Sequence, residues 1–369
     1  MHAADNNKNH DGQNWKRVAA MALALLLSGC TVIGPTSITT GRQAYNDAIV
    51  RTGNEQMLLA IVRNRYLERG SMLSVSSVTA NVKIATSAEV QAGFGDEDNY
   101  TGNLVPFTGG LVYEENPTIS YTPVEGQQYL RQLMTPLSVQ TVAGLVGGLA
   151  DPGPVYGSLL ESVNGLQNPG FLFSGVRTDP GFARFVEIMT ELKQANRLHW
   201  VDDDDSESSI GIVIDHYAES HLAQVTELMD LLGLPAPANS GAPLELPVLL
   251  ALDARATGGI GFSTRPVFAL IEILSAAVAV PDADLQSGRA TTVPPLGLVG
   301  QKLHIHYSTN KPDDSSVAVR YRGGWFYIDD TDLATKGLFR LMSTLWSVTI
   351  AETSSGSSSR PVLTVPVSR

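Results

Sequence analysis

The chain is poor in cysteine, with a single one among 369 residues, at position 30. One thiol cannot form an intrachain disulfide, and it cannot build a metal site from several thiolates. Charged residues make up only 17% of the chain, and 37 acidic residues against 25 basic ones give a net charge of −12. This shortage of basic charge argues against DNA or RNA as a ligand, because the protein repels phosphates at long range.

Hydrophobic runs long enough to span a membrane are also missing. Residues 18–27 are apolar, but this stretch is too short to cross about 30 Å of hydrocarbon. Lys16 and Arg17 precede it, and Ser28 and Gly29 follow it. A basic segment, a short apolar core and small residues before a cut form the pattern of a secretory signal peptide.

The end of this segment, Leu27-Ser28-Gly29-Cys30, resembles the lipobox of bacterial lipoproteins. The resemblance covers residues 1–30 and implies lipidation of Cys30, with several acyl chains such as palmitate. Stable anchoring takes two or more such chains. In lipoproteins of bacteria with two membranes, an aspartate after the cysteine commonly retains the protein at the inner membrane. Thr31 stands there instead, which implies the outer membrane, facing the periplasm. The alternative is an ordinary secretory signal with an unmodified cysteine.

Helical and strand-like patterns alternate along the chain without a strict βαβ rhythm. They predict an α+β fold of mixed antiparallel strands and amphipathic helices, in one large or two small domains. Hydrophobic content of 43% is enough for a core of this size. The predicted divisions are a signal peptide (1–29), a lipidated tether (30–41), an N-terminal helix and strand region (42–178) and a C-terminal α+β region (179–369).

Periodicity predicts the following helices: 42–68, 123–134, 138–149, 179–196, 221–232, 266–279 and 332–350. Within the first helix, Thr52-x-x-Glu55 matches a capping box and predicts a break into two pieces. The predicted strands are 72–86, 88–94, 118–122, 197–201, 210–215, 244–252, 302–307, 316–321, 325–328 and 362–367. The glycine-rich segments 93–110 and 257–263 are predicted to be a loop and a turn.

Two blocks near the ends of the chain carry a second resemblance. They are Tyr45-x-x-Ala48-Ile49 with Glu55-Gln56-x-Leu58-Leu59-x-Ile61-Val62-Arg63-x-Arg65-Tyr66, and Tyr321-Arg322-Gly323-x-Trp325-Phe326-Tyr327-Ile328-Asp329-Asp330-x-Asp332-Leu333. Both are similar to blocks in a family of uncharacterised bacterial lipoproteins and hypothetical proteins. The resemblance implies an exported, anchored protein and supplies no substrate, cofactor or catalytic residue.

The second block is the richest in aromatic side chains. Strand alternation places Trp325 and Tyr327 on one face and Phe326 and Ile328 on the other. We predict that this strand covers a helix capped by Asp330 or Thr331, with Trp325 in the core. The alternative is a surface that binds a partner or a glycan, because aromatic residues and arginine are enriched at interfaces.

The candidate interface residues are Tyr321, Arg322, Trp325, Tyr327, Arg65 and Arg69. Arg65 and Arg69 are four residues apart, so on a helix they share a face. They form a candidate basic strip for an acidic partner, and ordinary surface charge is the alternative.

Metal binding is not predicted. Residues 202–205 are four consecutive aspartates, but the alternating acidic positions and central glycine of a calcium loop are missing. A solvated hairpin tip explains them better. His304 and His306 point to the same face of a strand, yet two ligands without an H-E-x-x-H motif do not make a zinc site.

Catalytic motifs are equally weak. Asp215-His216 lacks the G-x-S-x-G elbow of a serine hydrolase, and residues 257–263 lack the phosphate-binding G-x-x-x-x-G-K-[ST] pattern. No cofactor is predicted.

These observations favour a non-enzymatic structural or adaptor role in the cell envelope. The predicted partners are the membrane, through lipidated Cys30, and an envelope protein. The alternative is an envelope hydrolase or carbohydrate-binding protein that uses Asp or Glu in a cleft, because glycosidic chemistry needs only two well-placed carboxylates. A close carboxylate pair in a deep pocket would favour this alternative, and a shallow surface would favour the adaptor.

Overall fold

Helices combine with antiparallel and mixed sheets in the computed structural model, which confirms the predicted α+β class. Contacts divide the chain into two units, residues 1–53 and residues 54–369. The structure describes residues 30–68, 70, 72–79, 82–90, 107–115, 118–123, 127–149, 151–172, 175–202, 210–217, 219–237, 242–250, 258–355 and 363–366.

The first described element is helix α2 (Cys30–Arg65), which runs without a break. The Thr52 hydroxyl donates a hydrogen bond to the Ala48 carbonyl, at 2.8 Å, one turn earlier in the chain. This is a bond inside a continuing helix, whereas a cap would accept from the turn that follows. The predicted capping box is therefore wrong, and the helix also includes residues 30–41, which we had predicted to form a tether.

A six-stranded sheet dominates the second unit. In sheet order its strands are β6 (Leu166–Gln167), β5 (Leu160–Val163), β10 (Ile260–Thr264), β9 (Leu244–Leu250), β8 (Ile210–Ile214) and β7 (Leu198–Asp202). Neighbouring strands are antiparallel except β9 and β10, which run parallel. The sheet combines strands from both sides of residue 178, where we placed a domain boundary.

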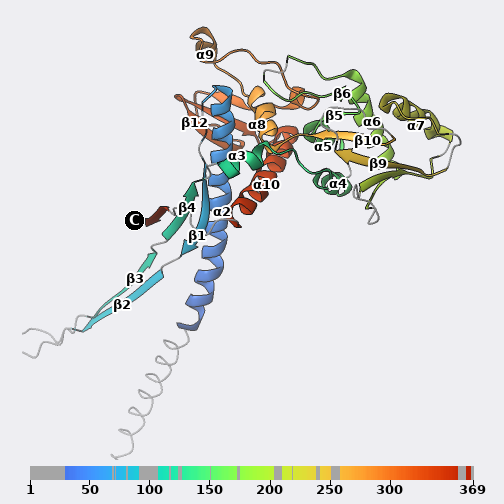
Figure 1. The fold of residues 1–369 in the computed structure, drawn as a ribbon. Coiled ribbons are helices and arrows are strands. Elements are labelled where there is room, and N and C mark those ends of the chain that lie inside the picture. The colour runs from blue at the N-terminus through green and yellow to red at the C-terminus, as the bar shows by residue number, and fades with distance from the viewer. Residues whose placement is uncertain are drawn as a thin grey trace, which may run out of the picture. The chain divides into compact units, whose positions relative to one another are not determined.

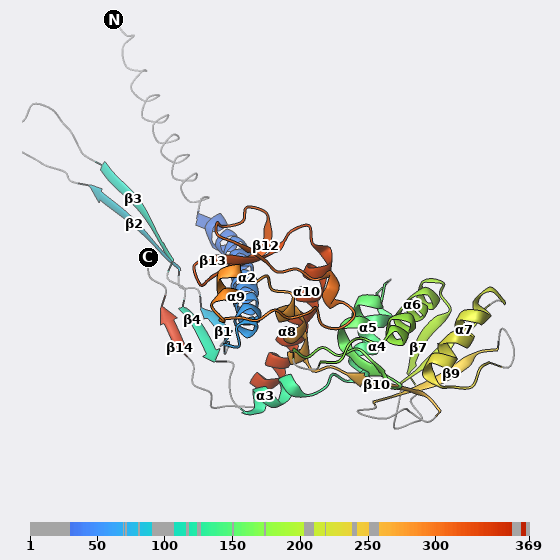
Figure 2. The same ribbon diagram turned by 90° about the horizontal axis from the view of Figure 1, so that it is seen from above.

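Helices pack against this sheet (Figure 1, Figure 2). They are α4 (Val139–Gly147), α5 (Gly153–Leu159) and α6 (Pro180–Gln194), and α7 (Glu219–Leu232) packs in turn on α6. The predicted starts of two of them are confirmed. Ser138 caps α4 by accepting from the Thr141 N–H at 3.0 Å, and Asp179 caps α6 by accepting from the Gly181 N–H at 2.7 Å.

Strand β10 corrects the prediction of a turn at residues 257–263. Its five residues are all buried, between β5 and β9. Gly259 lies just before it, and a Cβ atom there would come within 2.5 Å of the Pro247 carbonyl oxygen. The glycine therefore permits a close approach of backbones where β10 begins to pair with β9.

A buried arginine ties the end of β10 to neighbouring segments. Arg265 is fully buried, and its Nη1 donates to the carbonyl oxygens of Gly157 at 3.0 Å and Ser158 at 2.7 Å. Its Nη2 donates to the Asn168 carbonyl oxygen. Burial lowers the pKa of Arg265 to about 10, so the side chain stays charged at neutral pH.

The C-terminal region contains a three-stranded antiparallel sheet. In sheet order its strands are β11 (His306–Ser308), β13 (Gly324–Asp329) and β12 (Ser315–Tyr321). The helical elements of the region are α8 (Val267–Ala276), α9 (Asp282–Gln286), the 3-10 helix η1 (Gly300–Lys302) and α10 (Leu333–Ser355). Helices α8 and α10 pack against each other and against α3 (Gln127–Met134).

The remaining strands form two small antiparallel sheets. One contains β1 (Leu73–Thr79), β4 (Thr118–Pro123) and β14 (Leu363–Pro366), and the other pairs β2 (Val82–Val90) with β3 (Phe107–Glu115). We had predicted one strand over residues 72–86 and a loop over 93–110. The predicted strand is divided between β1 and β2, and the last residues of the predicted loop, 107–110, belong to β3.

One hydrophobic core joins the six-stranded sheet, its helices and the C-terminal sheet within the second unit. Fully buried side chains reach it from the end of α2, from α6, from β10 and from β13; among them are Leu58, Phe182, Phe262 and Phe326. The C-terminal sheet is therefore fixed to the body of the protein through its inner face.

Candidate functional site

Strand β13 divides its side chains between two faces, as the alternation predicted. Phe326 and Ile328 are fully buried, whereas Trp325, Tyr327 and Asp329 are only half-buried. This corrects the prediction that Trp325 is a core residue, because Phe326 is the aromatic that fills the core here. Trp325 and Tyr327, two of the predicted interface residues, lie together on the face that the core does not cover.

Neighbouring strands add aromatic and cationic side chains to this face. Directly opposed residues share a face of an antiparallel sheet, and the register pairs Tyr327 with His306 and Trp325 with Arg320. The rings of His306 and Tyr327 stack with centroids 5.3 Å apart, and those of His304 and His306 with centroids 6.2 Å apart. The two histidines thus point to the same side, as predicted.

Two cations flank Trp325. The Lys311 Nζ atom lies 5.7 Å from the centroid of the indole ring, and Arg320 is exposed on the opposing strand. Neither forms an ion pair with a carboxylate among the residues that the structure describes. We call this surface the outer face; it consists of His304, His306, Lys311, Arg320, Trp325 and Tyr327.

A tight turn fixes the outer face where β13 leads into α10. Asp329 accepts hydrogen bonds from the Thr331 hydroxyl at 2.6 Å and from its N–H at 2.8 Å, and these bonds lower the pKa of the Asp329 carboxyl. Asp332 then caps α10 by accepting from the Thr335 N–H at 3.0 Å. The cap is therefore Asp332, not Asp330 or Thr331 as we predicted.

Tyr321 and Arg322 contact residues at the end of α2 instead of lying on the outer face. Arg322 pairs with Glu68 at 2.5 Å, donates to the Tyr321 hydroxyl at 2.9 Å and lies 4.9 Å from the centroid of the Tyr66 ring. Hydrogen bonds from Tyr321 and Arg322 lower the pKa of the Glu68 carboxyl. These two predicted interface residues are thus engaged within the protein.

The same end of α2 is held by a buried carboxylate, Asp284. The Tyr66 hydroxyl donates to its Oδ2 at 2.8 Å, and Arg289 Nη1 to its Oδ1 at 3.0 Å. Burial alone would raise the pKa of Asp284, but these two hydrogen bonds outweigh it, and the pKa is lowered. Burial and the bond to Asp284 raise the pKa of Tyr66. Asp284 therefore acts as an ionised anchor for the helix end.

Replacing Asp284 with asparagine is expected to weaken the fold at neutral pH more than in acid. A carboxyl whose pKa is lower in the folded protein stabilises it fully above its unfolded pKa, near pH 4, and this contribution is lost as pH falls through the folded pKa. Urea midpoints of the full chain at about pH 7 and about pH 3 check this. Asp282→Asn, at an exposed position on α9, is the control. Equal losses at both pH values would contradict the assignment.

Arg65 is also placed inside the protein. It is 6% exposed, and its Nη2 donates to the Thr291 carbonyl oxygen at 2.5 Å. Helix α2 ends at Arg65, so Arg65 and Arg69 do not share a face of this helix as we predicted. Arg69 lies outside the described residues. A basic strip would need Arg65 at the surface, where the structure does not place it.

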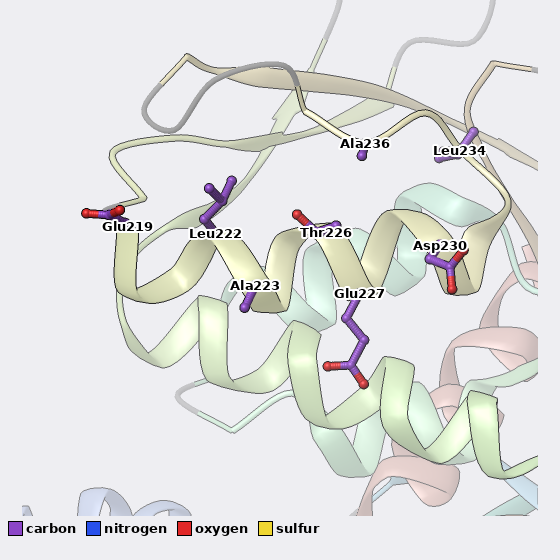
Figure 3. A pocket seen from close by; sticks show the side chains of 8 residues that line it. All are labelled: Glu219, Leu222, Ala223, Thr226, Glu227, Asp230, Leu234 and Ala236. Atoms are coloured by element: carbon purple, nitrogen blue, oxygen red, sulfur yellow. The ribbon is translucent and has the colours of Figure 1, made fainter.

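An open hollow of about 770 Å³ lies along α7 (Figure 3). Glu219 and Asp230 stand at opposite ends of the helix, and Leu222 and Glu227 leave it in different directions. Glu227 is bound by Arg184 of α6, with Nε to Oε1 at 2.8 Å. The carboxylates that line the hollow therefore do not point toward one another. A pair of carboxylates that acts in acid–base catalysis must converge on the reacting atoms.

Glu227 in this hollow and Asp215 outside it both have a lowered carboxyl pKa, because each is engaged by a neighbouring side chain. Hydrogen bonds from neighbouring side chains lower the pKa values of Asp215, through His216, and of Glu227, through Arg184. A general acid needs the opposite shift, so that it still holds a proton near neutral pH. These groups are thus poor candidates for the acid of the alternative, hydrolytic function.

The acidic tip at residues 202–205 lies only partly within the described residues. Asp202 ends β7 opposite Ile210, which confirms the β7–β8 hairpin, but residues 203–205 of the acidic tip lie outside the described residues. Within the described ranges, no three His, Cys, Asp or Glu side chains lie close enough to hold a metal ion.

The N-terminal signal is also outside what the structure describes. Leu27, Ser28 and Gly29 are not described, and Cys30 is described only through its backbone, as the first residue of α2. No helix in the described part of the chain is both long and apolar enough to cross a bilayer.

Sequence reasoning missed Lys311 and Arg320 as site residues, although a signal for Arg320 was present. The two-residue turn Arg322-Gly323 fixes the register of the hairpin and places Arg320 opposite Trp325. The outer face is therefore the site that the geometry favours, and two of the six predicted interface residues lie on it. Comparisons of the chain with protein-family models, with curated proteins and with solved structures gave no match.

Proposed function

We propose that this chain is a lipid-anchored protein of the outer membrane that faces the periplasm and acts as a non-enzymatic adaptor. Its contact surface is the outer face. One observation carries the proposal: aromatic side chains and two cations without carboxylate partners among the described residues lie together on a sheet whose other side is fixed in the core.

The chemistry of this surface suits recognition. Trp, Tyr and Arg are the residue types most often found as energetic anchors at interfaces. The opposite side of β13 carries Phe326 and Ile328, both fully buried, so the outer face is presented on a rigid support. The residues at its centre contain no carboxylate pair, which supports binding over hydrolysis.

Cys30→Ser is expected to abolish lipid attachment and to block cleavage of the signal peptide, because the chain contains no other thiol. Metabolic labelling with a palmitate analogue, followed by separation of membrane and soluble fractions, measures the result. Ser28→Ala, which keeps a small residue before the cysteine, is the control and should stay labelled. Persistent label on the Cys30→Ser variant would refute the anchor.

The membrane assignment has its own test. Thr31→Asp should move the labelled protein from the outer to the inner membrane fraction, since the resemblance to lipoproteins links that aspartate to retention. A wild-type protein already found at the inner membrane would overturn the outer-membrane assignment and leave the anchor intact.

A further inference from the structure

We propose that the outer face binds a carbohydrate chain that carries carboxylate groups. This inference rests on the proposed function, because it names the ligand class of the adaptor's contact surface. Three features support this inference: the free side of the Tyr327 ring, the two cations beside Trp325, and the hydrogen-bonding groups of Ser308 and His304 beside the aromatic rings.

Tyr327 offers one side of its ring to a ligand. Its other side is stacked on His306, at 5.3 Å between centroids. Across the strand on the free side, the register places Ala318, whose methyl group is too short to cover the ring. A sugar ring presents a flat face of C–H groups, which packs on an aromatic ring and leaves its hydroxyls free for hydrogen bonds.

Trp325 extends this aromatic surface by one position along the strand. Side chains two residues apart on a strand point the same way, so its ring follows that of Tyr327. Lys311 lies over the indole at 5.7 Å, an exposed contact that is weak enough to be displaced. Two successive sugar units can therefore contact two successive rings.

Charge selects an acidic ligand over a neutral one. Lys311 and Arg320 flank Trp325 without carboxylate partners among the described residues, in a chain whose net charge is −12. A guanidinium binds a carboxylate through two parallel hydrogen bonds, so Arg320 suits a uronate-like group better than a hydroxyl.

The shape of the face favours a sugar chain over an acidic protein segment. Protein interfaces centre on a side chain buried in a pocket, with dry surroundings. The outer face instead presents half-buried rings and polar groups such as the Ser308 hydroxyl, opposite Trp325, and His304. These groups match the alternating hydroxyls and C–H faces of a carbohydrate.

The test uses the full-length lipidated protein in detergent and three probes: oligogalacturonate, a neutral chito-oligosaccharide and polyglutamate. Calorimetric titration should show binding of oligogalacturonate, weaker binding of the neutral sugar and little of polyglutamate. Trp325→Ala and Tyr327→Ala should each weaken oligogalacturonate binding about tenfold, as expected when one stacking contact is lost. Trp325→Phe, which keeps a ring, should restore most of the affinity.

Arg320→Gln should remove the preference for the acidic sugar. Arg340→Gln, at an exposed position on α10, is the control and should bind as the wild type does. Urea midpoints close to that of the wild type show that each variant is folded.

Two results would overturn the inference. One is no measurable binding of oligogalacturonate to the wild type. The other is polyglutamate binding of equal strength that is lost in the same variants, which would identify an acidic protein segment as the ligand. Failure of the proposed function is distinguishable, because lipid labelling of Cys30 and its loss in Cys30→Ser are measured independently of any sugar.

Discussion

Replacing Arg265 with methionine is expected to destabilise the protein by about 3 kcal/mol or more, because the buried carbonyl oxygens of Ser158 and Asn168 lose their donor at once. The Gly157 carbonyl keeps one donor, the side-chain amide of Asn168. Each unsatisfied buried acceptor costs about 1–3 kcal/mol. Removing a buried charge returns part of this loss, since its desolvation is relieved. The net effect is still large, because methionine can donate to none of the three oxygens.

Arg265→Lys separates the hydrogen-bonding geometry from the charge. A lysine keeps the positive charge but carries its donors on one atom, which cannot span the carbonyls of Gly157, Ser158 and Asn168 as the guanidinium does. It should be nearly as damaging as methionine. The surroundings leave no room for adjustment, because a Cβ atom at Gly170 would already lie 2.8 Å from Nε of Arg265.

Urea denaturation of the full chain measures both variants, with the exposed Arg340→Met as a matched control. A midpoint that is unchanged in Arg265→Met would show that the carbonyls of Ser158 and Asn168 find other donors. It would contradict the assignment of Arg265 as the link between these segments.

Phe326→Ala is expected to cost about 3–5 kcal/mol, the usual range for truncating a fully buried aromatic side chain. Its ring is fully buried and packs against those of Tyr307, with centroids 5.2 Å apart, and Tyr321, at 6.1 Å. Removal leaves a cavity between the sheet and the end of α2, where Tyr66 also contacts it. Denaturation of the full chain measures the loss.

Trp325→Ala is the matched control, since it removes a larger ring from the preceding residue of the same strand. We expect a much smaller loss, because Trp325 is half-buried on the outer face. Similar losses in the two variants would contradict the division of β13 into a core side and a binding side.

Local signals in the sequence were sufficient for several elements. Ser138 and Asp179 are the first residues of two helices predicted from periodicity, and both cap the helices that the structure shows there. The alternation in residues 325–328 predicted which side chains of β13 share a face, but not which of the two faces is buried. Helix caps and strand alternation depend on residues a few positions apart in the chain, so a local sequence pattern is enough to predict them.

Features that depend on distant partners were missed. The segment 257–263 was predicted to be a turn because it contains three glycines, yet Ile260–Thr264 becomes a buried strand once β5 and β9 lie on either side. Thr52 fits a capping box by spacing alone, but the helix continues through it. Propensity is a weak guide wherever tertiary packing decides.

The candidate site was only partly predictable for the same reason. Trp325 and Tyr327 could be assigned to one face, but the sequence could not show that the other face is the buried one. Tyr321 and Arg322 lie close to them in the chain, and only the position of Glu68 and Tyr66 shows that they are engaged elsewhere. Arg65 was expected at the surface because arginine is seldom buried.

Because β10 lies between β5 and β9, we expect it to pair with β5 later than the strands that are close in sequence pair with each other. The hairpins β5–β6 and β7–β8 pair strands that are adjacent in the chain, and β9 pairs with β8 after helix α7. Strand β10 must join the two groups, and its pairing with β5 spans nearly a hundred residues of chain. Long-range pairing of this kind is slow, because the loop must close before the contacts form. A chain that ends before residue 260 therefore leaves β5 and β9 as unpaired edge strands of two separate groups. Unpaired edge strands can pair with other chains.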